Sequence, residues 1–168
     1  MRPLRGLAIA ALLAAAPAGA APGSILFAGG SWAAIDRGSV CVALTRSQRI
    51  AAKGQVQASA GFAFTPDKRR LGEFHAHLSH VPRAGASVIL GIGGQPFLLV
   101  GRGDWAWSSG PLQEQAIIAA ARSAEAMTIE SRDASGRRFV DPYLLDGAPT
   151  AIDAAAARCA LRGAGKIR

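Results

Sequence analysis

The feature that most constrains the fold of this chain is its cysteine content. The sequence has 168 residues and only two cysteines, Cys41 and Cys159, which lie far apart in the chain. Neither belongs to a Cys-x-x-Cys redox motif or to a set of residues with zinc-ligand spacing. If the two cysteines are joined, the fold must bring an early segment and the C-terminal region together and close most of the chain into one loop.

The two cysteines can form a disulfide only if the protein enters an oxidising compartment, and the first residues of the chain indicate whether it is exported. Residues 1–21 contain Arg2 and Arg5, then an apolar run over 6–16, then the small residues 18–20. This layout is typical of a cleavable secretory signal peptide. The apolar run is too short to span a bilayer, and no later segment is long enough either. The sequence therefore predicts a periplasmic or secreted protein without a membrane span, in which Cys41 and Cys159 form a disulfide.

The composition is basic. Lysine and arginine number 19 against 11 acidic residues, which gives a formal net charge of +8, and the basic residues are spread along the chain. Such a balance favours either solubility or contact with an anionic surface. Export, and the lack of a basic patch interleaved with aromatic residues, argue against nucleic acid as a partner.

The chain has the length of a single domain, and no internal repeat or linker divides it. We predict a signal peptide over 1–21, a short flexible leader over 22–31, one β-rich domain over 32–162 and a tail over 163–168.

Alternating and continuous apolar segments predict many short strands, and two stretches have helical spacing. In the late helix Ile152, Ala155 and Cys159 share one face. Pro142 suggests that its strand lies at an edge of the sheet or contains a bulge. The fold class is therefore mainly β, an antiparallel β-sandwich-like domain with two short helices late in the chain. The predicted strands are 40–44, 74–79, 87–92, 96–100, 105–107, 127–131 and 138–145, and the predicted helices are 111–122 and 150–160.

The order of segments in the later half resembles the invasion-associated locus B family of exported alphaproteobacterial proteins. Trp32 shortly ahead of Cys41 is similar to a tryptophan and cysteine near the start of that family's mature chain. The family usually has Asp-Thr-Tyr-Ser-Leu where this chain has residues 141–145, Asp-Pro-Tyr-Leu-Leu. The segments that carry the resemblance are 96–100, the tryptophans at 105 and 107, 117–122, 127–131, 139–147 and the closing helix with Cys159.

This resemblance implies a mostly β domain in the periplasm, at the envelope or outside the cell, linked in some pathogens to entry into host cells. The family supplies no catalytic residue to carry over. A family name and a fold do not by themselves fix a function.

Two histidines are candidate ligands. On a strand His75 and His77 project to the same face, about 7 Å apart, where Glu73 is a conceivable third metal ligand. No fourth ligand can be placed from the sequence. The alternative is a polar, solvent-facing strand.

Two tryptophans are candidate contact residues. Trp105 and Trp107 would share one strand face and could line a ligand groove, or they could pack in the core like Trp32. Just ahead of them, Arg102-Gly103-Asp104 matches a tripeptide that some integrins recognise, but Gly-Asp is also ordinary turn chemistry.

Catalytic motifs are missing from the sequence. Asp141 and Asp146 are the nearest acidic pair and suggest turn capping, and no serine lies in a Gly-x-Ser-x-Gly elbow. We therefore predict no enzyme activity and no cofactor. The expected function is that of an exported, non-catalytic domain that acts through contacts with an unknown protein or envelope component. The alternative is a periplasmic small-ligand or metal-binding module.

Overall fold

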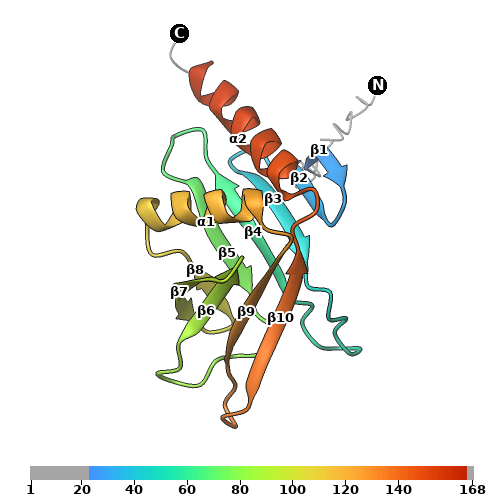
Figure 1. Cartoon of the computed structure of the whole chain (residues 1–168). Helices are drawn as coiled ribbons and strands as arrows, with labels where there is room; N and C mark the ends of the chain where they lie inside the picture. Colours follow the sequence, from blue (N-terminus) through green and yellow to red (C-terminus); the bar gives the residue numbers. More distant parts are fainter. Residues whose placement is uncertain (1–22, 166–168) are drawn as a thin grey trace, which may run out of the picture.

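The computed structural model describes residues 23–165, which form an antiparallel sheet and two helices (Figure 1). The predicted signal peptide lies outside the described residues, as do residues 166–168. The elements are β1 (Ser24–Gly29), β2 (Trp32–Asp36), β3 (Cys41–Arg46), β4 (Ser59–Phe64), β5 (Leu71–His77), β6 (Val88–Ile92), β7 (Gln95–Arg102), β8 (Trp105–Trp107), α1 (Pro111–Ser123), β9 (Ala126–Arg132), β10 (Arg138–Leu144) and α2 (Ala148–Ala164).

The strands form one sheet in the order β1-β2-β3-β4-β5-β8-β7-β6-β9-β10. Most neighbours are also consecutive in sequence and are joined by short turns, such as the glycine pair Gly93-Gly94 between β6 and β7. Two pairings are not local. β5 pairs with β8. β6 pairs directly with β9, although β7, β8 and α1 lie between them in the sequence. These two pairings decide which outward-facing side chains of the sheet become neighbours.

The sheet bends so that its two halves enclose one core, which gives the sandwich-like arrangement. Phe62 and Phe74 from the first half pack with ring centroids 5.4 Å apart, in the same buried cluster as Leu90 and Ile129 from the second half. β10 pairs only with β9 within the described sheet, so it is an edge strand, which is one of the two positions that Pro142 indicates.

Both helices lie at one end of the sheet, the upper end in Figure 1. α2 packs on β2 and β3, and α1 packs on β5. The face that α2 buries includes Ala151, Ile152, Ala155 and Cys159, which confirms the face predicted from residue spacing. Cys159 thereby reaches Cys41 at the start of β3, with Cα atoms 5.8 Å apart, and the two sulfur atoms lie at disulfide-bonding distance.

The leader and the tail differ from expectation. Residues 22–31 were expected to be flexible, yet they contain β1, because Leu26 and Phe27 pack against the core and the strand pairs with β2. The helix α2 runs through Gly163 to Ala164, beyond the predicted domain end at 162. The sequence patterns also missed β4, in which Phe62 and Phe64 alternate with small residues.

Candidate functional site

The pairing of β5 with β8 brings all four sequence-predicted side chains together on the outward face of the sheet. His75 lies opposite Trp107, and His77 lies opposite Trp105. The His77 and Trp105 rings stack with centroids 4.6 Å apart and an interplanar angle of 10°. Trp105 also lies 6.3 Å from His75 and 6.1 Å from Trp107 between ring centroids. We call these four residues the aromatic–histidine stack.

One ring nitrogen of each histidine in the stack has a polar contact within the protein. His77 Nε2 lies 2.7 Å from Asp104 Oδ2, and this hydrogen bond lowers the pKa of the Asp104 carboxyl. His75 is half-buried, and burial lowers its pKa while a contact with the carbonyl of Glu73 opposes the shift. The Glu73 carboxylate is paired with Arg70 at 3.2 Å.

The positions of His75 and His77 do not favour a shared metal ion. Both histidine rings stack against Trp105 rather than converging on one point. Over residues 23–165 there is no group of three or more His, Cys, Asp or Glu side chains that could hold a metal ion. In the integrin-like tripeptide, Arg102 ends β7, and Gly103 and Asp104 form the turn to β8, where Gly103 has a φ of 62°. Its aspartate is the one bonded to His77.

Apolar side chains continue from the stack across the outward face of the sheet. Val100 pairs with Trp107, and Leu98 pairs with Ile89 on β6. Leu98 is 61% exposed, Val100 55% and Trp105 37%. We call Ile89, Leu98, Val100, Trp105 and Trp107 the outer apolar strip.

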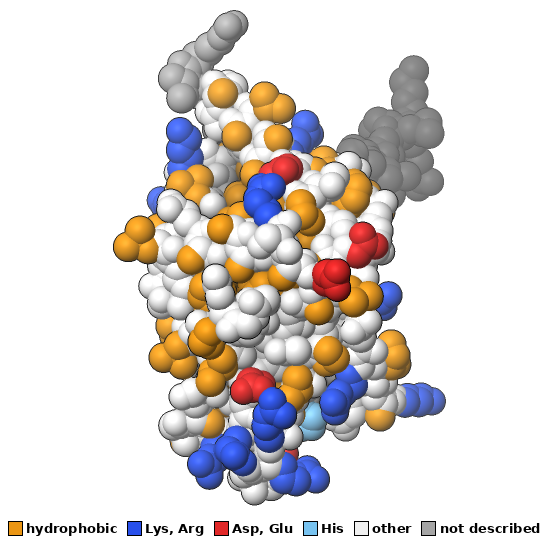
Figure 2. Space-filling model, in the orientation of Figure 1, with side chains coloured by type: hydrophobic (Ala, Val, Ile, Leu, Met, Phe, Trp, Pro, Cys, Tyr) orange, Lys and Arg blue, Asp and Glu red, His pale blue; other side chains and the backbone are white. Residues whose placement is uncertain are grey.

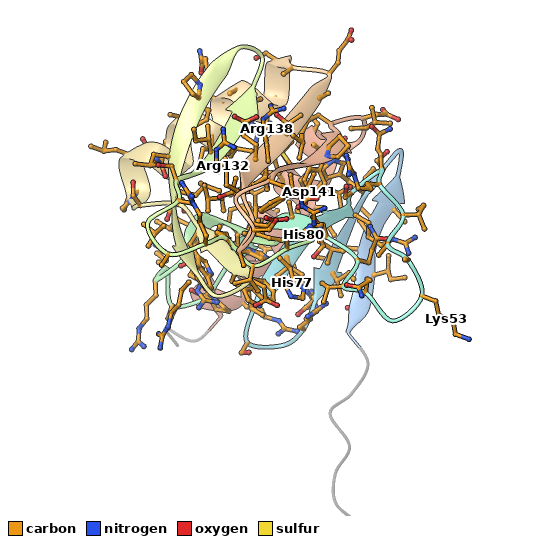
Figure 3. The ribbon with its side chains drawn as sticks, turned by 90° about the horizontal axis from the view of Figure 1, so that it is seen from below. Lys53, His77, His80, Arg132, Arg138 and Asp141 are labelled. Atoms are coloured by element: carbon orange, nitrogen blue, oxygen red, sulfur yellow. A yellow bond between two sulfur atoms is a disulfide. The ribbon has the colours of Figure 1, made fainter. Side chains whose placement is uncertain are left out.

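A hollow lined by arginines adjoins the strip. It has a volume of about 400 Å³, and Ile89 belongs both to its wall and to the strip. Arg132 and Arg138 are cross-strand partners on β9 and β10, and Arg83 comes from the connection between β5 and β6. Figure 3, seen from below, shows Arg132 and Arg138 side by side, and Figure 2 shows basic side chains gathered at this lower end. We call this the arginine hollow; its other lining residues include Ser87, Glu130 and Ser131.

The carboxylates near the hollow neutralise only part of its charge. Glu130 is ion-paired with Arg138. Asp133 is paired with Arg137 at 3.4 Å and accepts hydrogen bonds from the backbone N–H groups of Ser135 and Arg137. Within residues 23–165 no carboxylate forms an ion pair with Arg83 or Arg132. The hollow therefore carries two uncompensated positive charges.

Asp141 was expected to cap a turn, and this is wrong. It lies inside β10, fully buried, because alternation along the strand points its side chain at the core. Its Oδ2 accepts a hydrogen bond from the Ser79 backbone N–H at 3.0 Å. The Ser79 hydroxyl in turn lies 2.9 Å from His80 Nδ1. In a Ser-His-Asp triad the carboxylate orients the imidazole, whereas this carboxylate binds the serine backbone.

Tyr143 lies two residues further along β10, on the same inward face as Asp141. Burial raises the pKa of its phenol, and the Asp141 carboxylate raises it further. The tyrosine is therefore neutral at ordinary pH and acts as a core residue.

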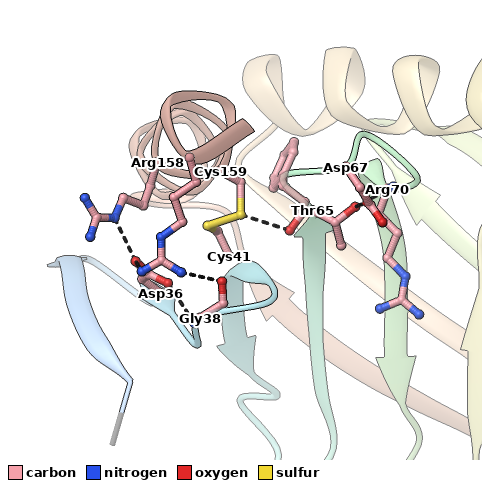
Figure 4. The surroundings of a disulfide bond; sticks show 10 residues. Asp36, Gly38, Cys41, Thr65, Asp67, Arg70, Arg158 and Cys159 are labelled. Carbon is pink, nitrogen blue, oxygen red and sulfur yellow. Dashed lines mark hydrogen bonds and ion pairs between the residues drawn. A yellow bond between two sulfur atoms is a disulfide. The ribbon is translucent and has the colours of Figure 1, made fainter. Parts of the chain in front are cut away.

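The charged groups beside the disulfide have a different arrangement (Figure 4). Asp36 is buried, with only 1% of its side chain exposed, and its Oδ2 lies 2.7 Å from Arg158 Nε and 2.8 Å from Arg162 Nη2. Its Oδ1 accepts a hydrogen bond from the Gly38 backbone N–H at 2.8 Å. The hydrogen bond from Arg158 is the main cause of a lowered pKa at Asp36, followed by the Gly38 bond. This cluster ties α2 to the turn between β2 and β3.

Comparison with family models, characterised proteins and solved structures finds no match to this chain. The resemblance to the invasion-associated locus B family therefore stays a prediction. Among the helices of residues 23–165, neither is long and apolar enough to cross a membrane.

Proposed function

We propose that this protein is an exported, non-catalytic domain that works by contacting a protein or a component of the cell envelope. The observation that carries the proposal is the outer apolar strip, which lies on one face of the sheet and is continuous with the arginine hollow. The disulfide between Cys41 and Cys159 supports export, since such bonds persist in oxidising compartments.

The strip has the properties of a contact surface. Contiguous exposed apolar residues bordered by charged ones mark interaction sites, because their exposure to water is unfavourable until a partner covers them. Here Leu98 and Val100 lie on β7, which is hydrogen-bonded to a strand on each side. The surface is thus held in place by the sheet, so binding costs little additional ordering.

Other arrangements on the surface give less support to rival functions. In the aromatic–histidine stack, the ring of His77 lies against Trp105 and its Nε2 is bonded to Asp104, which favours a structural role over a metal site. The Ser79–His80 pair lacks a carboxylate on the imidazole among its hydrogen bonds within residues 23–165. A nucleophile without an oriented base is a weak basis for catalysis.

Photo-crosslinking in exporting cells tests the proposal. A photoreactive phenylalanine analogue replaces Leu98 in one variant and Val100 in another. The matched control carries the same analogue at Leu112 on α1, which is 85% exposed and lies outside the strip. We expect discrete adducts with an envelope or protein component from positions 98 and 100 and none from 112. Absence of adducts, or equal adducts from all three positions, would contradict the proposal.

A further inference from the structure

We propose that the arginine hollow binds a phosphate monoester dianion, either free in solution or displayed on a lipid headgroup. This inference rests on the proposed function and deepens it, because it names the chemistry of the partner at the end of the outer apolar strip.

The charge of the hollow matches a dianion. Arg83, Arg132 and Arg138 line it, and Glu130 is the acidic residue in its wall. The carboxylate of Glu130 is paired with Arg138, so it repels an incoming anion less than a free carboxylate would. The net charge of these four groups is two positive charges. A phosphate monoester carries about −1.5 to −2 near neutral pH, so a single group of this kind would neutralise the site.

The arginines are held by backbone contacts between different segments. The Arg83 N–H donates to the Arg132 carbonyl at 2.9 Å, which ties the β5–β6 connection to the end of β9. The Ser131 hydroxyl donates to the Ser87 carbonyl at 2.8 Å, which ties the far side of the same connection to β9. An isolated bridge between Pro82 and Asp133 adds a third link. The backbones that carry Arg83 and Arg132 are therefore fixed relative to each other.

The side chain of Arg132 is also oriented. Its Nη1 donates to the Gly136 carbonyl at 3.0 Å. Gly136 has a φ of 82°, and a Cβ added there would lie 3.8 Å from Arg83 Nη1. Arg83 and Arg132 thus approach the same turn of the β9–β10 hairpin, and their guanidinium groups gather beside it. Planar guanidinium groups suit bidentate hydrogen bonds to the oxygens of phosphate.

The size and surroundings of the hollow favour a small headgroup. A volume of about 400 Å³ lies near the lower limit for small-molecule sites. The exposed Ser87 adds a hydroxyl at the wall, and Ile89 adds an apolar side chain shared with the outer apolar strip. A phosphate in the hollow would therefore place the remainder of its ester against the strip. A monocarboxylate would leave one of the two positive charges uncompensated.

Binding measurements on the exported protein test this inference with two probes. One probe is glycerol 3-phosphate in solution, and the other is phosphatidylcholine vesicles with and without phosphatidic acid. The hollow variant is Arg83→Gln/Arg132→Gln. The control is Lys68→Gln/Arg69→Gln, which makes the same change of net charge in the exposed turn between β4 and β5. We expect saturable binding by the wild type and the control, and affinity about tenfold lower or more in the hollow variant, since it loses charge-assisted hydrogen bonds.

The two probes separate the sources of the phosphate. Loss of glycerol 3-phosphate binding in the hollow variant supports a site for free phosphate esters, and loss confined to vesicles with phosphatidic acid supports a lipid headgroup. Vesicle binding that falls equally in both double variants would show diffuse charge attraction and overturn the inference. So would absence of binding to both probes by the wild type. Adducts from position 98 together with no phosphate binding would overturn this inference and leave the proposed function standing. Phosphate binding in the hollow without adducts from position 98 or 100 would overturn the proposed function and leave the phosphate site standing.

Discussion

The two ends of this molecule use arginine in opposite ways. At the helix end, formed by α1, α2 and the turn at 37–40, Arg158 and Arg162 converge on the buried Asp36. At the loop end, formed by the connections at 78–87 and 133–137, Arg83 and Arg132 converge on a hollow and have no carboxylate partner within residues 23–165. The two ends lie at opposite poles of the sheet (Figure 1).

This difference separates a stabilising role from a binding role. A buried carboxylate is costly unless it is paired and hydrogen-bonded, so Asp36 requires its arginines for the fold to be stable. Exposed arginines without a carboxylate partner add little to the stability of the fold, and they repel one another. The same side chain therefore stabilises the structure at one end and is available to an external anion at the other.

The largest expected effect comes from removing the disulfide at the helix end. Cys41 and Cys159 are separated by 118 residues, and the chain-entropy model assigns a loop of that length a stabilisation of about 4–5 kcal/mol. We expect Cys41→Ala/Cys159→Ala to lower the free energy of unfolding by about this amount, measured by urea denaturation.

The control for this prediction is the wild type with reductant, whose unfolding curve should approach that of the double variant. A count of free thiols in the purified protein, by alkylation under denaturing conditions, should find none before reduction. Two free thiols, or an unchanged denaturation midpoint in the variant, would contradict the prediction that a disulfide stabilises the helix end.

A smaller effect is expected from Asp36→Asn. The amide keeps a hydrogen-bond acceptor for Gly38 but loses the charge that Arg158 and Arg162 share. The arginine side chains are 44% and 36% exposed, so water offsets part of the loss, and we expect a cost of about 1–2 kcal/mol by urea denaturation at neutral pH. The control is Asp153→Asn, because Asp153 is 62% exposed and paired with Arg122. Its cost should be smaller.

The same variant has a pH signature. The pKa of Asp36 is lowered in the folded state, chiefly by the hydrogen bond from Arg158. Its stabilisation is therefore fully present above the pKa of an aspartate in the unfolded chain, about 4, and is lost as pH falls through the lower pKa of the folded state. Wild type should lose stability more steeply than Asp36→Asn below about pH 4. Equal slopes would show that Asp36 does not contribute in this way.

Local patterns predict much of the fold. Alternation of apolar and polar residues from Phe74 to Leu78 predicts a strand that overlaps most of β5. The glycine pair at 93–94 predicts the β6–β7 turn. The spacing of Ile152, Ala155 and Cys159 predicts the buried face of α2. β1 was missed because Ile25-Leu26-Phe27 lies among Pro, Gly and Ala residues that suggest a leader.

Non-local pairings account for what the sequence could not predict. Alternation along a strand predicts that His75 and His77 share one face and that Trp105 and Trp107 share another. Only the β5–β8 pairing sets the two pairs against each other. The arginine hollow needs the β9–β10 register together with the path of the β5–β6 connection. In the sequence its arginines are simply members of a dispersed basic set.

The smallest expected effect on stability comes from Arg83→Gln/Arg132→Gln at the loop end. Neither arginine is buried or ion-paired to a carboxylate of residues 23–165, so the free energy of unfolding should change by less than about 0.5 kcal/mol in urea denaturation. Saturating glycerol 3-phosphate should stabilise wild type, by about 2.7 kcal/mol at one hundred times its dissociation constant, and leave the variant nearly unchanged. A loss of more than about 1 kcal/mol without ligand would mean that these arginines stabilise the fold as Arg158 and Arg162 do, and the contrast between the two ends would fail.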